Sequence, residues 1–284
     1  MYVISGAAGH TGSVTAKSLL KKNLPVRVIV RSREKAAELE KLGAEVAVAD
    51  LRDADALTEA LRGGKVLYLM NPPNFFSEDQ FAELDKVINA YRAAIENSAL
   101  EKLVVLSSVG AHLAEKTGNI LTAHILEEAF GNLNIPVTFI RAGSFMENWS
   151  SVLETAATSG VLPSFLQPLD KKVPQVAAAD IGRIIAEEMQ EKTEENKIVE
   201  LAGFWLSPEE NAEIIGKVLG KQVKAVAVPE QQWNDILQTF NSPKNAESLA
   251  DMYRGINSGY IDFETDNQIE GKVGFEEYVR GALK

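Results

Sequence analysis

The amino-acid sequence predicts an α/β fold, with a doubly wound parallel sheet and a smaller C-terminal α/β lobe. The first 145 residues alternate short β-rich runs with longer amphipathic runs, which is typical of parallel strands joined by crossover helices. Each expected strand is almost wholly apolar, because helices cover both faces of such a sheet. A third observation is a turn with three glycines, which follows the first strand and opens the first helix.

Strands and helices are expected to alternate through this first part of the chain. The strands are residues 2–5, 26–30, 45–49, 66–69, 103–107 and 137–141. The helices are residues 12–22, 34–42, 54–61, 78–97 and 119–130. Ligands of a doubly wound sheet bind beyond the carboxyl ends of its strands, so functional residues are expected directly after these strands.

The pattern changes after Arg141. Prolines and a Ser-Gly pair break the chain into short pieces, and a new helix is expected at residues 180–191. Ser207, Pro208 and two glutamates are typical of a helix start, and this helix should end near residue 219, before Gly220. A strand at residues 223–228 and a helix containing residues 232–240 follow. We expect a domain at residues 1–150, with helix 180–191 packed back on it, and a smaller lobe at residues 151–284.

The composition argues against several classes of function. The 284 residues include no Cys and three His, so disulfides are excluded and no metal site is expected. A net charge of −11 does not suit nucleic acids, which require a basic face. No apolar run is long enough to span a membrane, and a strand beginning at Tyr2 leaves no room for a secretory signal. We expect a cytoplasmic monomer or homodimer that binds a small molecule.

Three evenly spaced glycines mark the end of the first strand. Gly6 permits a tight turn, Gly9 allows the backbone to approach a pyrophosphate, and Gly12 allows close packing of helix on strand. The free N–H groups at the helix start then bind the anion. This context predicts a Rossmann-type sheet that binds a nicotinamide dinucleotide, and the alternative is an ordinary turn of small residues. The other residues of the turn assigned to the cofactor are Ala8, His10 and Thr11.

The end of the second strand indicates the form of the cofactor. An acidic residue there would hold the ribose 2′-hydroxyl of NAD, whereas this sequence has Arg31 and Arg33. Guanidinium groups suit a 2′-phosphate, so NADPH is favoured and NADH remains possible. The alternative is that both arginines are solvated charges and that Glu34 serves the ribose.

Two residues after the third strand are candidates for contact with the adenine. Asp50 offers a carboxylate and Leu51 an apolar surface. The alternative for Asp50 is that it caps the next helix.

With these motifs identified, the chain resembles the NmrA-like group of atypical short-chain dehydrogenases/reductases, which includes NAD(P)H-dependent quinone oxidoreductases and azoreductases. The resemblance extends over almost the full length. The segments that carry it are residues 6–12, 31, 50–51, 70–73, 106–108, 141–148, 180–182 and 206–210.

The resemblance implies roles for residues at the other strand ends. Those that border the cofactor are Met70, Asn71, Pro72, Ser107, Gly143, Ser144 and Phe145, with Ser107 near the nicotinamide ribose. Those that line the substrate side are Phe145, Asn148 and Trp149. No feature of the sequence requires a flavin.

The chain departs from the related classical enzymes at one motif. Those enzymes use Tyr-x-x-x-Lys, in which Lys lowers the pKa of Tyr so that the phenol exchanges a proton with a carbonyl. The aligned positions here hold Ile120 and His124. Ile120 cannot carry a proton. His124 is therefore the candidate catalytic residue and a candidate to bind the ribose, and the alternative is a polar residue at the pocket rim.

The missing tyrosine favours an electrophilic substrate. A quinone or azo compound accepts hydride readily and can take its proton from solvent, so orientation against the nicotinamide suffices. We hypothesise that Phe76, Phe145 and Trp149 form a flat apolar slot for it, with core packing as the alternative. The rival function is a non-catalytic NADP(H)-binding redox sensor that regulates a partner protein. A third, isoflavone or ether reductase, requires a Lys as base, which His124 replaces poorly.

Overall fold

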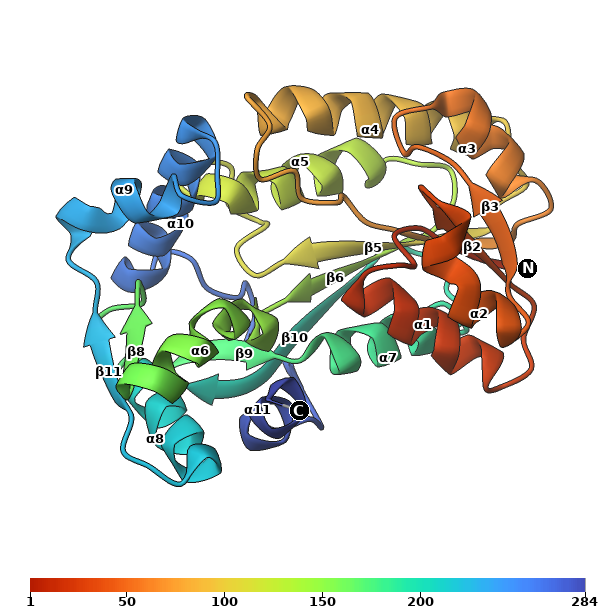
Figure 1. Ribbon diagram of the computed structural model, residues 1–284. Helices are drawn as coiled ribbons and strands as arrows, with labels where there is room; N and C mark the ends of the chain where they lie inside the picture. Colours follow the sequence, from red (N-terminus) through yellow and green to blue (C-terminus); the bar gives the residue numbers. More distant parts are fainter. Residues whose placement is uncertain (284) are drawn as a thin grey trace.

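The computed structural model describes residues 1–283 of the chain. Its centre is a mostly parallel sheet with helices on both faces (Figure 1). The strand order is β3-β2-β1-β4-β5-β6-β10-β9-β7, and β12 pairs with β10. The chain winds outward from β1 in both directions, so the predicted doubly wound α/β fold is confirmed.

The bounds of the strands are as follows. They are β1 Tyr2–Ile4, β2 Val26–Val30, β3 Glu45–Val48, β4 Val66–Leu69, β5 Lys102–Ser108, β6 Val137–Ala142, β7 Ser144–Phe145, β8 Val161–Ser164, β9 Val173–Val176, β10 Lys197–Leu206, β11 Lys224–Ala227 and β12 Ile269–Glu270. The first six strands begin and end within one residue of the predicted positions, because each is a short apolar run bounded by polar or turn residues.

The α-helices lie between and after these strands. They are α1 His10–Leu20, α2 Ala37–Lys41, α3 Ala54–Leu61, α4 Gln80–Glu96, α5 Leu121–Phe130, α6 Ser150–Ser159, α7 Ala178–Glu188, α8 Pro208–Leu219, α9 Trp233–Leu237, α10 Pro243–Ser258 and α11 Phe275–Ala282. Short 3-10 turns extend several of them, such as Arg33–Ala36 before α2 and Gly118–Ile120 before α5.

Two apolar cores lie on opposite faces of the sheet. Helices α3, α4 and α5 cover one face, and α1, α2 and α7 cover the other (Figure 1). Helix α7 packs directly on α1, where the Thr15 hydroxyl donates a hydrogen bond of 3.1 Å to the carbonyl of Gly182. A third core joins α6, α8 and α11 at the far end of the molecule from the N-terminus.

Strand β10 is the main element that the sequence did not predict. Its first half pairs with β6 in parallel and its last three residues pair with β9 in antiparallel register. Gly203, with φ of +73°, lies between the two halves, and this backbone conformation favours glycine. The strand therefore changes partner midway, and it carries Trp205 beyond the edge of the parallel sheet.

The C-terminal half contains three further helices that the sequence did not predict, α6, α10 and α11. The expected start of α8 is confirmed. Ser207 accepts from the amide of Glu210, whose side chain bonds back to the amide of Ser207, and Gly220 ends the helix in the left-handed conformation. The predicted helix near residues 232–240 is shorter than expected and is followed by α10.

Replacing Asp180 by Ala should lower the free energy of unfolding by about 2–4 kcal/mol. The buried Asp180 carboxylate, on α7, accepts hydrogen bonds of 2.8 Å from the amides of both Lys272 and Val273, and thereby fixes the chain before α11. Urea denaturation measures the effect. The exposed Glu187→Ala, on the same helix, should change stability by less than about 0.5 kcal/mol, and equal losses in the two variants would contradict the role of Asp180.

Candidate functional site

The glycine turn between β1 and α1 is tightly packed. Gly6 has φ of +60°, and a Cβ atom added there would lie 2.8 Å from the Met70 sulfur. The amide of Gly9 closes the turn on the carbonyl of Gly6 at 2.9 Å. A Cβ at Gly12 would lie 2.5 Å from the Gly6 carbonyl oxygen. The helix therefore meets the turn at a distance that only glycine permits.

Helix α1 begins at His10, two residues before the predicted start. Gly9 is its N-cap, and within residues 1–283 no side chain caps this end. The N–H groups of the first helical turn have no carbonyl partner inside the helix and can bind an anion. Gly12 thus lies inside the helix, where it faces the turn.

Two hydroxyl groups attach this turn to the neighbouring strand β4. The Ser5 hydroxyl donates to the carbonyl of Tyr68 at 2.9 Å, and the Thr11 hydroxyl lies 2.9 Å from the phenol of Tyr68. Tyr68 is fully buried, and burial raises the pKa of its phenol. The phenol stays neutral at ordinary pH and serves here to hold the start of α1 in place.

The arginines that follow β2 differ in their surroundings. Arg33 forms an ion pair of 2.6 Å with Glu40. Arg31 is exposed and forms no ion pair with any of the residues described. Its charge lies near Asp50 and contributes to the lowered pKa of that carboxyl. Arg31 is therefore the freer of the two guanidinium groups.

Asp50 is held by Arg52, a residue that sequence reasoning missed. The guanidinium donates to both carboxylate oxygens, at 3.0 and 2.7 Å. These hydrogen bonds lower the pKa of Asp50 to about 2. The suggestion that Asp50 caps the next helix is wrong, because Asp53 is the N-cap of α3 and accepts from the amide of Ala56 at 3.0 Å.

The segment after β4 is attached to α10. The Asn245 side-chain amide donates to the carbonyls of Asn74 and Phe75, at 3.1 and 2.9 Å. Asn71 and Pro72 precede these residues in the same segment. Phe76 is 71% exposed, and it does not line the pocket described below.

The ends of β5 and β6 are joined by buried charges. The Ser107 hydroxyl donates to the carboxylate of Glu127 at 2.5 Å. Arg141 binds both oxygens of Glu127, at 2.9 and 2.7 Å, and its side chain is only 4% exposed. Ser107 thus lies at the strand end where it was expected, with its hydroxyl engaged by Glu127.

Ile120 and His124, which occupy the positions of the classical tyrosine and lysine, differ in their surroundings. Ile120 is buried and packs with Val109 and Ile261. His124 is half-buried, with Nδ1 at 2.8 Å from the carbonyl of Ala111. Because a carbonyl only accepts, Nδ1 carries the hydrogen, and in the neutral ring Nε2 is left as an acceptor.

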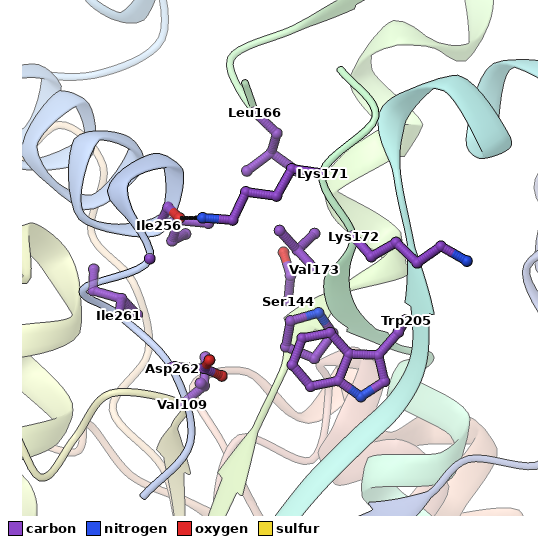
Figure 2. A pocket seen from close by; sticks show the side chains of 12 residues that line it. Val109, Ser144, Leu166, Lys171, Lys172, Val173, Trp205, Ile256, Ile261 and Asp262 are labelled. Atoms are coloured by element: carbon purple, nitrogen blue, oxygen red, sulfur yellow. Dashed lines mark hydrogen bonds between the residues drawn. The ribbon is translucent and has the colours of Figure 1, made fainter. Parts of the chain in front are cut away.

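A pocket lies beyond the ends of β5 and β6 (Figure 2). Val109 and Ser144 contribute to it just after these strands. Strands β9 and β10, the C-terminal end of α10 and the segments before β9 and after α10 supply the rest. Its walls are mostly apolar, and the indole of Trp205 is 41% exposed. The charged groups at its rim are Lys171, Lys172 and Asp262.

Both lysines of the pocket are engaged by other groups. Lys171 donates to the carbonyls of Ile256 and Asn257, at 2.7 and 3.0 Å, and Lys172 pairs with Glu210 at 2.8 Å. Apart from the carboxylate of Asp262, the pocket therefore presents mainly apolar side chains. Sequence reasoning missed Trp205 because the strand that carries it was not predicted.

The residues expected on the substrate side do not line this pocket. Phe145 is partly buried and packs against the core that contains α7. Trp149 is 8% exposed in the third core, and its indole N–H donates to Gln175 at 2.8 Å. Core packing, the alternative stated for this tryptophan, describes its position. Asn148 is exposed on the short turn before α6, and Gly143 packs against the carbonyls of Pro174 and Ala202.

Comparison with known proteins identifies the family. The model of the NmrA-like family matches residues 2–279. The chain belongs to the NmrA-like family. It is 30% identical over 282 residues to quinone oxidoreductase 2 of Escherichia coli (strain K12), covering 96% of this chain and 94% of that protein.

Two further proteins extend the comparison. An NAD(P)H azoreductase of Xenophilus azovorans is 26% identical over 255 residues, which cover 88% of this chain and 84% of the relative. The crystal structure of NADPH-dependent quinone oxidoreductase QOR2 from Escherichia coli, complexed with NADPH, is 26% identical, covers both chains completely and has a TM-score of 0.80. Both comparisons extend over most or all of the NmrA-like chain.

Two negative findings apply to the part of the chain that the structure describes. No group of three or more His, Asp or Glu side chains there is arranged to hold a metal ion. None of its helices combines the length and apolar composition that crossing a membrane requires.

Replacing Gly12 by Ala should destabilise the fold by about 1–3 kcal/mol, because the new methyl group would overlap the Gly6 carbonyl. The matched control is Gly281→Ala in α11, where an added Cβ meets no atom within 4 Å. That change should be neutral or stabilising by up to about 1 kcal/mol. Urea unfolding curves compare the two variants, and an undiminished stability of Gly12→Ala would contradict the close approach.

Proposed function

We propose that the chain is an NADPH-dependent oxidoreductase that transfers hydride to an electrophilic small molecule such as a quinone or azo compound. The observation that carries the proposal is the packed glycine turn, which leads into a helix start without a side-chain cap. A largely apolar pocket beyond the ends of β5 and β6 supports it. The named activities of the quinone oxidoreductase and azoreductase relatives support it.

The geometry of the glycine turn supports the proposed cofactor. Gly9 and the first N–H groups of α1 would bind the pyrophosphate. Asp50 and Leu51 would lie by the adenine, and Asn71 and Pro72 would border the cofactor. The residues proposed to lie near the nicotinamide and its ribose are Ser107, His124, Gly143, Ser144 and Phe145.

The preference for NADPH is proposed to depend mainly on Arg31. Arg31 forms no ion pair among the residues described, whereas Arg33 must leave Glu40 to bind a phosphate. The neighbouring Asp50 is already paired with Arg52, so it offers a weakened acceptor to a bare 2′-hydroxyl. Guanidinium groups recognise phosphate by charge and by paired hydrogen bonds.

Hydride transfer to a quinone or azo compound requires the protein to do little more than orient the acceptor against the nicotinamide. When bound, the nicotinamide supplies the hydride. Ile120 offers no proton, so the proton that completes reduction of a quinone or azo compound would come from solvent. Trp205 and the apolar walls would hold the acceptor flat, and His124 would accept a hydrogen bond from the ribose through Nε2. Placement of two reactants in this way lowers a barrier by several kcal/mol.

The two parts of the chain are proposed to contribute to different binding sites. Residues 1–150 would bind the cofactor, and residues 151–284 would complete the acceptor pocket through Val173, Trp205 and Ile256. A small molecule is thus the expected partner. The redox-sensor hypothesis would share the cofactor site, and turnover distinguishes the two.

Purified protein with NADPH should reduce 1,4-naphthoquinone and a simple azo dye well above the uncatalysed rate, and should reduce an unactivated aldehyde much more slowly. The reason is that Ile120, at the position of the classical tyrosine, cannot supply the proton that an unactivated carbonyl requires. Oxidation of NADPH followed at steady state measures the rates. Tight NADPH binding without turnover of any acceptor would reject the enzyme and favour the sensor.

Replacing Arg31 by Ala should weaken NADPH binding about tenfold to a hundredfold, the equivalent of one charge-assisted hydrogen-bonded contact. Binding of NADH should change less than about threefold, because NADH lacks the 2′-phosphate. Titration calorimetry provides both constants. Arg33→Ala should have a smaller effect, and Arg62→Ala, an exposed residue paired with Glu59, serves as the charge control. Equal losses for the two cofactors would show that Arg31 does not bind the phosphate.

A further inference from the structure

Residues 261–265, here called the strap, cross the strand ends between α10 and β12. Ile261 and Asp262 line the pocket on the side opposite Trp205 (Figure 2). Phe263 does not line it, but its ring meets the indole of Trp205 edge to face, with centroids 6.5 Å apart. The first part of the strap therefore shapes the pocket and supports its aromatic wall, Trp205.

The next two residues attach the strap to buried charges. Glu264 accepts a hydrogen bond of 2.5 Å from Nη1 of Arg141, whose Nε and Nη2 donate to Glu127. The Thr265 hydroxyl donates to Glu200 on β10 at 2.7 Å. Glu200 is only 3% exposed, and it also accepts from the amides of Glu264 and Thr265 at 2.8 and 3.1 Å.

The guanidinium of Arg141 also connects the ends of β5 and β6. Arg141 lies near the end of β6, three residues before Ser144 of the pocket, and its partner Glu127 accepts from Ser107 at the end of β5. A buried arginine with carboxylates on several elements holds those elements in a fixed relation, because an unpaired charge in this environment is costly. Arg141 thus links the strap to both central strand ends.

Close apolar packing holds Ile261, the first residue of the strap, in a fixed position. Ile261 is 6% exposed. Its side chain fits against Gly110 and Gly255, where an added Cβ would lie 2.9 and 2.5 Å from it. The strap is therefore fixed at one end by apolar packing and at the other by Arg141 and Glu200.

We propose that Glu264 and Thr265 are positioning residues, which hold the strap as a wall of the acceptor pocket through Arg141 and Glu200. The inference rests on the proposed function insofar as the pocket is where the acceptor binds. The strap acts on acceptor affinity through Ile261, Asp262 and the support of Trp205, and none of its residues is among those proposed to bind the cofactor. The Arg141 contact lowers the pKa of Glu264, so the attachment persists at mildly acidic pH.

The test uses Glu264→Gln, which keeps an oxygen acceptor but loses the charge, and Thr265→Val, which replaces the hydroxyl with a methyl group of similar size. Binding of 1,4-naphthoquinone without NADPH is followed by quenching of tryptophan fluorescence, and Trp205→Phe identifies the part of the signal that comes from the pocket. Both strap variants should raise the naphthoquinone Kd about fivefold to tenfold, with the Kd of NADPH changed less than about twofold. In turnover, the KM for the acceptor should rise while kcat changes little.

The control is Glu101→Gln, which breaks an exposed ion pair with Lys65 outside the pocket and should alter neither constant. An unchanged naphthoquinone Kd in both strap variants overturns the proposal, as does an equal rise in the Kd of NADPH. No quenching of Trp205 in the unaltered protein also overturns it. If the strap variants weaken quinone binding but even the unaltered protein fails to oxidise NADPH, the proposed function fails and the strap assignment stands.

Discussion

The contact between the start of α1 and the turn after β1 is the constraint on which the proposed cofactor site depends. A helix can direct its free N–H groups at a ligand beside the sheet only if it begins almost against the strand. Gly12 provides that approach, since any larger side chain would overlap the Gly6 carbonyl. Tyr68 then holds Thr11, on the same helical turn, against β4. Sheet, turn and helix start thereby form one rigid unit.

A second constraint operates near the carboxyl ends of β5 and β6, where buried charge replaces close backbone contact. Arg141 and Glu200 are nearly inaccessible, and each is held by partners from more than one element. Such a network adds little net stability, because desolvation of the charges offsets their attraction. Its consequence is geometric: the ends of β5, β6 and β10 and the strap keep a fixed relation. The pocket lies among these elements, so its shape depends on contacts that its own lining does not make.

The two halves of the chain differed in how well local patterns predicted them. The strands of the first half were predicted to within a residue because most of their residues are apolar and polar or turn residues bound each run. Strand β10 was missed, since Glu200 interrupts its apolar run and Gly203 bends it between two partners. Helix α10 begins with Ser242 as N-cap and Pro243 as first residue, the signal that correctly identified α8 through Ser207. The sequence therefore marks the start of α10 in the same way.

The sequence by itself determined the doubly wound sheet, the glycine turn and the guanidinium groups after β2. These depend on residues close together in the chain, whose spacing and polarity act locally. Only the tertiary structure decided which side chains meet at the pocket. Trp205, Ile256 and Ile261 come from separate elements, and Trp149, an equally plausible aromatic in sequence, packs in a core instead. Side-chain partners across such distances follow from how the elements pack, and no local pattern records that packing.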